Sequence, residues 1–493
     1  MYNCYCLFIS LFYYISLVHA DEDNWIFPDG FLIGAATSAY QIEGAWNTSD
    51  KGESVWDRFT HADSGRIEDG SNGDVAADSF HRYKEDVQLL KQLGVDFYRF
   101  SLSWTRILPT GYANVISKVG IKYYHDLLDE LEKNDIKPFV TIYHWDHPQL
   151  FQDMGGWASE AMVDLFGDYA RVVFKEYGHR VKFFFTINEP DVICETGYYL
   201  GIKAPGLQLG RYGQYVCAHN LLKAHARAYH IYNEEFRAQQ KGKIGIVIHS
   251  HYYYSKYGND TVSEDVAWQF AFGKYAHPIF SKEGDYPDSI KRRIAENSKF
   301  EGLLRSRLPT FSREWVDYIK GTSDVLGFNH YNSYNVEPIL GSNKTIYEND
   351  DGLVYTHDPK WPKTPTSWLR IVPSGLLDNL RKIKDNYGDI EVYITENGIA
   401  DTGELTDTQR MGYLYSYMKA MLTAIKTFGC NVKAYTVWSL LDNFEWQNGY
   451  KERYGLFHVD FTDENRTRSP KKSVPWLTNV IKTRNLQPPM DGP

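Results

Sequence analysis

Two glutamates have the residue type and the position needed for acid–base chemistry. Glu189 closely follows the apolar run Val181–Ile187, and Glu396 directly follows the run Glu391–Thr395. Two carboxyl groups that face each other across a pocket, one as proton donor and the other as nucleophile or base, are what cleavage of a glycosidic bond requires. A single glutamate at a strand end more often caps a helix or pairs with a cation, and that alternative stays open for each one alone.

The elements that must position these glutamates are eight short apolar runs separated by amphipathic stretches. Near-continuous apolar runs are typical of strands buried on both faces of a parallel sheet. The pattern predicts one domain, a (β/α)8 barrel with long loops at the C-terminal face. The rival, a doubly wound open sheet, lacks the glycine-rich turn expected after its first strand. The runs are Phe31–Ala36, Phe97–Leu102, Pro138–Tyr143, Val181–Ile187, Ile244–Ile248, Val325–Phe328, Glu391–Thr395 and Val432–Val437.

Helical periodicity lies between the runs. Apolar residues recur every three or four positions from Phe80 to Leu93, and a second such stretch spans Leu221 to Phe236. This spacing is typical of helices that pack one face on a core. Alternation of strands and helices without a linker supports the barrel.

Polar and aromatic residues cluster just past the ends of the runs, where a barrel places its active site. Isolated tryptophans and histidines are more often core residues, so their position beside the two glutamates is what makes them candidates. Neither a metal nor a cofactor is expected, because no H-E-x-x-H or paired-histidine spacing occurs. The candidates are Gln41, Arg99, His144, Asn188, Asn329, Tyr331, Trp438, Glu445 and Trp446.

Four of these segments resemble the signatures of family 1 glycoside hydrolases, the β-glucosidase family. Residues 186–190 (TINEP) and 394–398 (ITENG) resemble its two active-site motifs, residues 31–44 its N-terminal motif, and residues 438–446 its sugar-pocket segment. The similarity runs from about Trp25 to about Lys482, and the chain looks most like secreted insect members.

The resemblance implies a retaining mechanism with Glu189 as acid/base and Glu396 as nucleophile. Arg99 and the Tyr331 hydroxyl would keep Glu396 anionic. The charge on Glu396 would in turn raise the pKa of Glu189 and keep it protonated.

The resemblance also implies a hexose site. Trp438 would form an apolar floor under the ring, Trp446 would donate its N–H, and Trp368 would line the leaving-group pocket. Asn329 would lie with Tyr331 at the substrate. The residues that would hydrogen-bond sugar hydroxyls are Gln41, His144, Asn188 and Glu445.

Three functions follow from this. The first is a retaining β-glucosidase that releases terminal non-reducing β-D-glucosyl residues from a small-molecule glucoside. The second is a myrosinase-type thioglucosidase acting on glucosinolates; such a sulfated substrate needs fixed cations, and Glu195, Lys203 and Tyr334 offer no evident basic pair. The third is a non-catalytic glycan-binding relative, a class that typically lacks one of the two carboxylates.

Composition and charge exclude other classes. The chain has 493 residues, of which 43% are hydrophobic and 24% charged, which is ordinary for a globular protein. Its net charge of −10 and the absence of a basic run argue against a nucleic-acid partner. We expect a monomer or homodimer.

The N-terminus predicts secretion. Residues 1–20 carry an apolar stretch without charged residues and are interpreted as a signal peptide before a catalytic barrel at 21–493. An N-terminal membrane anchor is the alternative, but the stretch is short for one, and no stable membrane insertion is expected. Of the cysteines left after cleavage, Cys194, Cys217 and Cys430, at most two can pair. An extracellular location, such as a gut lumen, is supported by four N-x-S/T sites, at Asn47, Asn259, Asn343 and Asn465.

Overall fold

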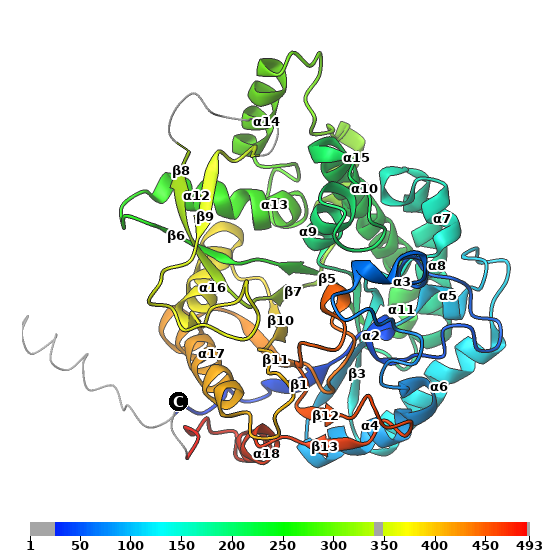
Figure 1. The fold of residues 1–493 in the computed structure, drawn as a ribbon. Coiled ribbons are helices and arrows are strands. Elements are labelled where there is room, and N and C mark those ends of the chain that lie inside the picture. Colours follow the sequence, from blue (N-terminus) through cyan, green and yellow to red (C-terminus); the bar gives the residue numbers. More distant parts are fainter. Residues whose placement is uncertain (1–24, 340–348, 491–493) are drawn as a thin grey trace, which may run out of the picture.

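The computed structural model describes residues 25–339 and 349–490 and contains a closed barrel of eight parallel strands (Figure 1). The strands follow one another around the ring in chain order, as predicted. Each lies within two residues of its predicted run, so all eight predictions are confirmed. They are β1 (Leu32–Ala36), β2 (Phe97–Ser101), β3 (Lys137–Tyr143), β4 (Phe183–Asn188), β5 (Lys243–His249), β7 (Val325–Asn329), β10 (Val392–Asn397) and β11 (Val432–Trp438).

Helices surround the barrel (Figure 1). The predicted helix from Phe80 matches α4 closely, whereas α10 begins well before Leu221. The helix α10 contacts α8 and the π-helical turn Ile193–Tyr199, and its buried residues lie on several of its faces, so it shows no single apolar stripe. The principal helices are α4 (Ser79–Leu93), α6 (Lys118–Lys133), α8 (Ala161–Tyr177), α10 (Gly210–Ile231), α16 (Pro373–Tyr387), α17 (Thr408–Phe428) and α18 (Ser473–Thr483).

The remaining elements lie mainly in the connections. The β5–β7 and β7–β10 connections are long and contribute a second sheet, in the order β6-β8-β9. Its strands are β6 (Tyr252–Ser255), β8 (Ser333–Pro338) and β9 (Leu353–Thr356), and β12 (Phe457–Val459) pairs with β13 (Arg468–Pro470). The shorter helices are α2 (Ala39–Ile42), α3 (Val55–Ala62), α5 (Trp104–Ile107), α7 (Gln149–Asp153), α9 (Pro190–Val192), α11 (Arg237–Gln240), α12 (Thr261–Trp268), α13 (Lys274–Phe280), α14 (Asp288–Phe300) and α15 (Arg313–Ile319).

The barrel interior has an apolar layer below a polar one. Phe97 stacks on Phe139 with ring centroids 4.1 Å apart, and both belong to a cluster that fills the barrel. Side chains alternate along a strand, so Arg99 and Thr141, two residues further on, also point inward. The Arg99 Nε accordingly donates to Thr141 Oγ1 at 3.1 Å, which places a buried guanidinium at the C-terminal end of the barrel.

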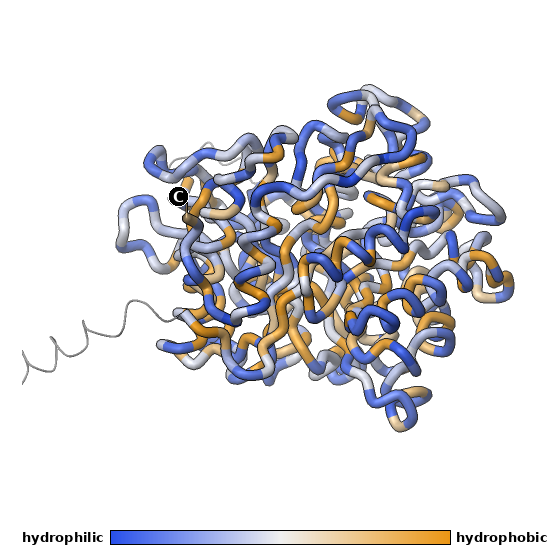
Figure 2. The backbone as a smooth tube through the Cα atoms, turned by 90° about the horizontal axis from the view of Figure 1, so that it is seen from below, coloured by the Kyte–Doolittle hydropathy of each residue, from blue (hydrophilic) through white to orange (hydrophobic). Residues whose placement is uncertain are grey.

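Apolar residues gather inside the fold and hydrophilic ones on its outer turns (Figure 2). No helix in residues 25–339 or 349–490 is long and apolar enough to cross a membrane. The predicted signal peptide and Asn343 lie outside the described residues, whereas Asn47, Asn259 and Asn465 are exposed. Cys194 and Cys217 form a disulfide, and Cys430 is buried and free.

Candidate active site

Glu396, on β10, is held by two donors at the C-terminal end of the barrel. Arg99 Nη1 lies 2.7 Å from Glu396 Oε1, and the Tyr331 hydroxyl donates to Glu396 Oε2 at 2.8 Å. Burial, followed by the charge on Glu396, raises the pKa of Tyr331 well above its usual value, so the phenol keeps its proton and remains a donor. Both contacts favour the ionised form of Glu396.

Glu189 stands at the turn between β4 and α9. Its φ of 49° lies in the left-handed region, which a non-glycine residue adopts only where its surroundings fix it. The Glu189 backbone N–H donates to the Val247 carbonyl at 3.0 Å, and Asn329 Nδ2 donates to Glu189 Oε1 at 2.7 Å. These contacts on β5 and β7 fix where the carboxyl group points.

The pKa of Glu189 is raised to about 7. Burial is the larger cause and the charge on Glu396 the second, so the predicted effect of that charge is present but is not the main one. His249 acts in the opposite direction and lowers the pKa of Glu189. A glutamate protonated near neutral pH beside one held as a carboxylate is the arrangement that acid-assisted displacement needs.

His249, at the end of β5, forms an ion pair next to Glu189. Its Nδ1 lies 2.9 Å from Asp191 Oδ2. Although burial acts to lower the pKa of His249, Asp191 raises it to about 9. An imidazolium therefore stands beside the acid/base candidate at neutral pH.

Both glutamates line one cavity of about 180 Å³. Tyr331 and Trp368 lie on one side of it with ring centroids 6.2 Å apart, and the nearly parallel rings of His144 and Trp438 are 5.9 Å apart. Burial, then Arg99 and Lys203, lower the pKa of His144 well below its usual value, so it is a neutral hydrogen-bonding group. The predicted residues that line this cavity are Glu189, Glu396, His144, Tyr331, Trp368, Trp438, Glu445 and Trp446.

The other predicted residues lie behind the cavity wall and hold those that line it. Asn188 Oδ1 accepts from Arg99 Nη2 at 2.7 Å, and its Nδ2 lies 3.2 Å from His144 Nε2. Gln41 Nε2 lies 3.3 Å from Glu445 Oε2. Arg99 contacts Glu396, and Asn329 contacts Glu189. Each of the four residues in this second group therefore contacts a residue that faces the cavity.

Comparison with known proteins agrees with this geometry. The profile of the family described as Glycosyl hydrolase family 1 matches residues 23–486. This chain belongs to that family. Family 1 enzymes are retaining β-glycosidases, and the fold is the barrel of this family.

The chain is similar to some individual family 1 members over nearly the whole length of both proteins. The chain is 44% identical to Myrosinase 1 of Brevicoryne brassicae, covering 93% of this chain and 99% of that protein. A solved aphid myrosinase has a TM-score of 0.90 at 43% identity, covering 94% and 100% of the two chains. A rice β-glucosidase in a covalent complex with Glc has a TM-score of 0.86 at 37% identity, covering 92% and 98%.

Sequence reasoning missed several residues of this family 1 cavity. His249 and His251 follow the fifth apolar run and could have been found by the same strand-end rule. Lys203 lies on a long loop, with its Nζ 4.5 Å from the centroid of the Trp145 ring, and no local pattern marks it. Lys203 and the His249 imidazolium come from distant segments and line one cavity, although the sequence offered no evident basic pair. The missed lining residues are Trp145, Val192, Lys203, His249, His251 and Tyr454.

Glu445 also differs from a simple exposed carboxylate. Burial, then Glu452, raise the pKa of Glu445 to about 8. Around neutral pH the Glu445 side chain is therefore protonated in a large fraction of the molecules, and in that form it can donate as well as accept a hydrogen bond.

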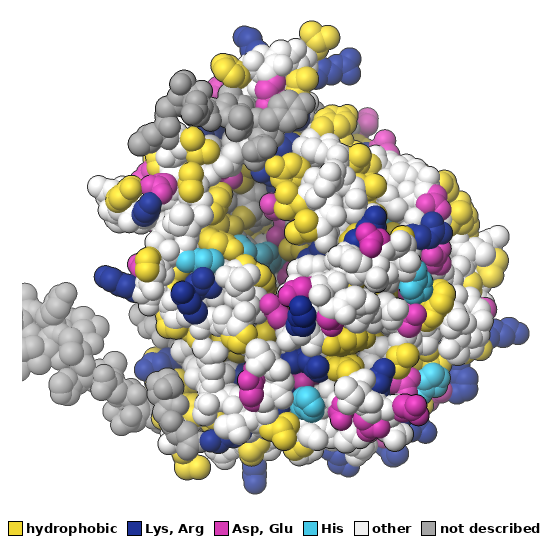
Figure 3. Space-filling model, viewed as in Figure 1, with side chains coloured by type: hydrophobic (Ala, Val, Ile, Leu, Met, Phe, Trp, Pro, Cys, Tyr) yellow, Lys and Arg dark blue, Asp and Glu magenta, His cyan; other side chains and the backbone are white. Residues whose placement is uncertain are grey.

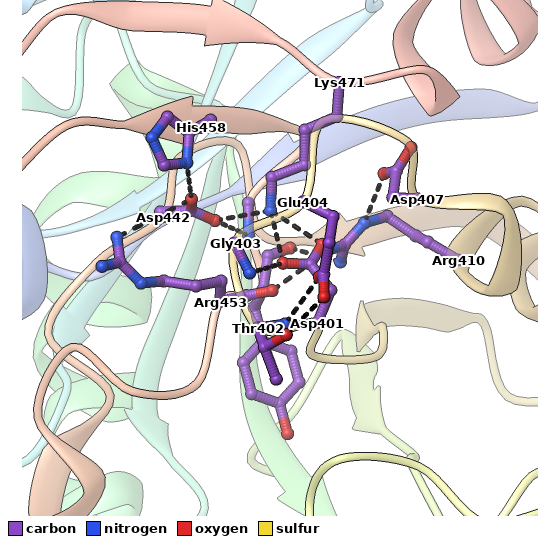
Figure 4. Close-up of polar contacts among 12 residues, drawn as sticks. Asp401, Thr402, Gly403, Glu404, Asp407, Arg410, Asp442, Arg453, His458 and Lys471 are labelled. Carbon is purple, nitrogen blue, oxygen red and sulfur yellow. Dashed lines mark hydrogen bonds and ion pairs between the residues drawn. The ribbon is translucent and has the colours of Figure 1, made fainter.

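A buried ion network beneath the family 1 site fixes the segment that carries Glu445 (Figure 4). Lys471 Nζ lies 2.8 Å from Asp401 Oδ2, after β10, and 2.9 Å from Asp442 Oδ1, after β11. Arg410 pairs with Asp401 and Asp407, and His458 lies 3.2 Å from Asp442 Oδ2. Lys471 thus joins the loops that follow two neighbouring strands.

Proposed function

We propose that this protein is a retaining β-glucosidase, with Glu189 as acid/base and Glu396 as nucleophile. The observation that carries the proposal is that the two carboxyl groups line one cavity with environments that favour opposite ionisation states. Arg99 and Tyr331 bind the Glu396 carboxylate, while burial raises the pKa of Glu189 to about 7.

The reaction follows in two displacements. Glu396 attacks the anomeric carbon, and the bond to the leaving oxygen breaks as Glu189 transfers its proton to that oxygen. Loss of the negative charge on Glu396 in the glycosyl–enzyme then lowers the pKa of Glu189. Glu189 takes a proton from water, whose oxygen attacks the anomeric carbon and releases glucose and the Glu396 carboxylate.

The sugar would lie between Trp438 and the hydrogen-bonding side chains of the cavity. The neutral His144 and the partly protonated Glu445 supply donors and acceptors for hydroxyl groups. Asn188, Asn329 and Gln41 would act at the rear of this site, and Trp368 would contact the leaving group.

Thioglucoside hydrolysis is the second candidate. It is favoured by the similarity to Myrosinase 1 and by Lys203 and His249 in the cavity, which are cations that a sulfated leaving group could use. A thiolate leaves without much protonation, so such a substrate would depend less on Glu189 than an O-glucoside does.

A substrate panel tests both candidates. Hydrolysis rates would be compared over neutral aryl and alkyl O-glucosides, the matching galactosides and fucosides, and one glucosinolate. We expect O-glucosides to give the highest kcat/KM. A glucosinolate as the best substrate would favour the second candidate, and sugar binding without turnover of any member would identify a non-catalytic glycan-binding relative.

We also propose that the protein is secreted and N-glycosylated. The apolar N-terminus, three exposed N-x-S/T sites and the Cys194–Cys217 disulfide support this. After expression in a eukaryotic cell, we expect to find the protein in the culture medium. Its chain should begin at Asp21, and its mass should fall on deglycosylation. A protein retained in the cell with residues 1–20 attached would contradict this proposal.

A further inference from the structure

A second cavity, of about 510 Å³, adjoins the catalytic one. The two share Val192, His249 and His251 as lining residues. The second cavity lies among the start of α10, the π-helical turn Gln269–Gly273 with α13, and the β6-β8-β9 sheet. Figure 3 shows the molecule hollowed where Figure 1 draws α9 and α13. A leaving group held beside Glu189 therefore has this second space next to it.

Lys274, the first residue of α13, lines this cavity and is only 5% exposed. Its ammonium makes no hydrogen bond or ion pair within the part of the chain that the structure describes. Its Nζ lies 5.2 Å from the centroid of the Tyr275 ring and 5.7 Å from that of Tyr215, and the charges of Glu195 and Asp191 also favour its ammonium form. Burial lowers the pKa of Lys274 to about 8. A buried ammonium without an acceptor is costly, and a ligand that supplies an acceptor would relieve that cost.

Three of the four carboxylates that line the same cavity already have a hydrogen-bond or ion-pair partner. Asp191 pairs with His249, and Asp350 accepts from Tyr215 and pairs with Arg307. Asp351 accepts from Tyr355 at 2.8 Å. Glu195 is exposed.

The other cations and the walls also suit an anion attached to an apolar body. The His249 imidazolium and Arg211 line the same space, and Arg211 Nη1 donates to Gln214 Oε1 at 2.9 Å. Three cations and four carboxylates line the cavity, and Arg307, which pairs with Asp350, adds a fourth cation next to it. Rings of Tyr253, Phe270 and Tyr334 supply apolar surface.

We infer that the second cavity binds an oxyanion, a carboxylate or a sulfate, on the substrate's leaving group, with Lys274 as its direct donor. The inference rests on the proposed glucosidase function and narrows its substrate class. It makes Lys274 a specificity-determining residue, because a neutral leaving group of the same shape cannot use the ammonium equally well. A charge-assisted hydrogen bond of this kind corresponds to about tenfold or more in affinity.

Two matched substrate pairs test the inference and distinguish the anions. The first is 4-methylumbelliferyl β-D-glucoside and its carboxylated umbelliferyl counterpart. The second is a glucosinolate and the same compound without its sulfate. For each pair the ratio of kcat/KM, anionic over neutral, would be measured in wild type and in Lys274→Met, with Ki used where no turnover occurs. The comparison between variants cancels differences in leaving-group acidity.

We expect the ratio to fall about tenfold or more in Lys274→Met for at least one pair. Lys382→Met is the matched control, because Lys382 lies 3.0 Å from Asp265 and 5.0 Å from the centroid of the Trp268 ring, outside this cavity. Its ratios should equal those of wild type. Equal ratios in wild type and Lys274→Met for both pairs would overturn the inference while leaving the glucosidase proposal intact, provided that neutral glucosides are hydrolysed.

A wild-type measurement keeps the test valid if Lys274→Met does not fold. The carboxylated coumarin product should inhibit wild type at a concentration about tenfold lower than 4-methylumbelliferone does. Equal inhibition by the two coumarins, together with no preference for the sulfated compound, would overturn the inference. Failure of wild type to hydrolyse any glucoside would instead remove the proposed function on which it rests.

Discussion

A single guanidinium, that of Arg99, contacts Glu396 Oε1 through Nη1 at 2.7 Å and Asn188 Oδ1 through Nη2 at 2.7 Å. Asn188 directly precedes Glu189, so one buried side chain of β2 fixes Glu396 and the end of the strand that carries Glu189. A lysine cannot reproduce this, since its single ammonium lacks the planar fork of donors.

Replacing Arg99 should therefore affect both charge and geometry. Arg99→Met removes the cation that contacts Glu396 Oε1 and the donor that contacts Asn188 Oδ1. We expect a loss of roughly 100-fold in kcat/KM, the size found for removal of a preorganised electrostatic contact. Arg99→Lys keeps a cation but lacks the planar fork of donors, so it should lose less kcat/KM than Arg99→Met. A kcat/KM in Arg99→Met equal to that of wild type would contradict the role given to this contact.

Glu189→Gln should reveal its role through the leaving group. The variant cannot protonate the leaving oxygen, which an alkyl leaving group needs and a dinitrophenyl leaving group does not. The loss of hydrolysis rate should therefore be roughly 100-fold or more larger for an alkyl glucoside than for a dinitrophenyl glucoside. Glu445→Gln is the control, because Glu445 faces the same cavity but would contact the sugar, and both substrates should lose rate alike. Equal losses in Glu189→Gln would argue that another group is the acid.

His249 should influence the pH at which activity falls on the alkaline side. Its imidazolium lowers the pKa of Glu189, so His249→Asn should raise that pKa and move the alkaline limb of kcat/KM above that of wild type, which we expect near pH 7. His251→Asn is the control, since burial, then the charge on His249, keep the pKa of His251 well below its usual value and it has no charge to lose. A limb that moves equally in both variants would show a packing effect instead.

The network around Lys471 should contribute strongly to stability. Lys471→Met leaves the buried Asp401 and Asp442 without their shared cation, which we expect to lower the free energy of unfolding by about 3 kcal/mol. Burial acts to raise the pKa of Asp442, but His458 and Lys471 lower it overall. The stabilisation is therefore present at neutral pH and is lost as the pH falls through that pKa. Denaturant unfolding at two pH values measures both effects.

Lys451→Met is the matched control for that measurement. Lys451 lies 2.9 Å from Glu68, and both side chains are at least half exposed. Exposed pairs contribute at most about 1 kcal/mol. Similar losses in the two lysine variants would contradict the role of the buried network.

The sequence allowed the barrel and the meeting of Glu189 and Glu396 in one cavity to be predicted, because both depend on local order along the chain. Apolar runs identify strands, and Glu189 and Glu396 directly follow two of them. Lys203, His249 and Lys274 were not predicted as a group, since they come from separate segments whose proximity to the two adjoining cavities depends on the tertiary fold. The dominant effect of burial on Glu189 was missed for the same reason: desolvation depends on what surrounds a side chain in space.

The central claim is that Glu396 becomes covalently bound to the sugar, and trapping that intermediate tests it most directly. A 2-deoxy-2-fluoro-glucosyl substrate with a good leaving group slows the second displacement, so the adduct should accumulate as activity is lost. Peptide mapping by mass spectrometry is expected to find one sugar per chain, attached to Glu396. A label on any other residue, or inactivation without a label, would contradict the account.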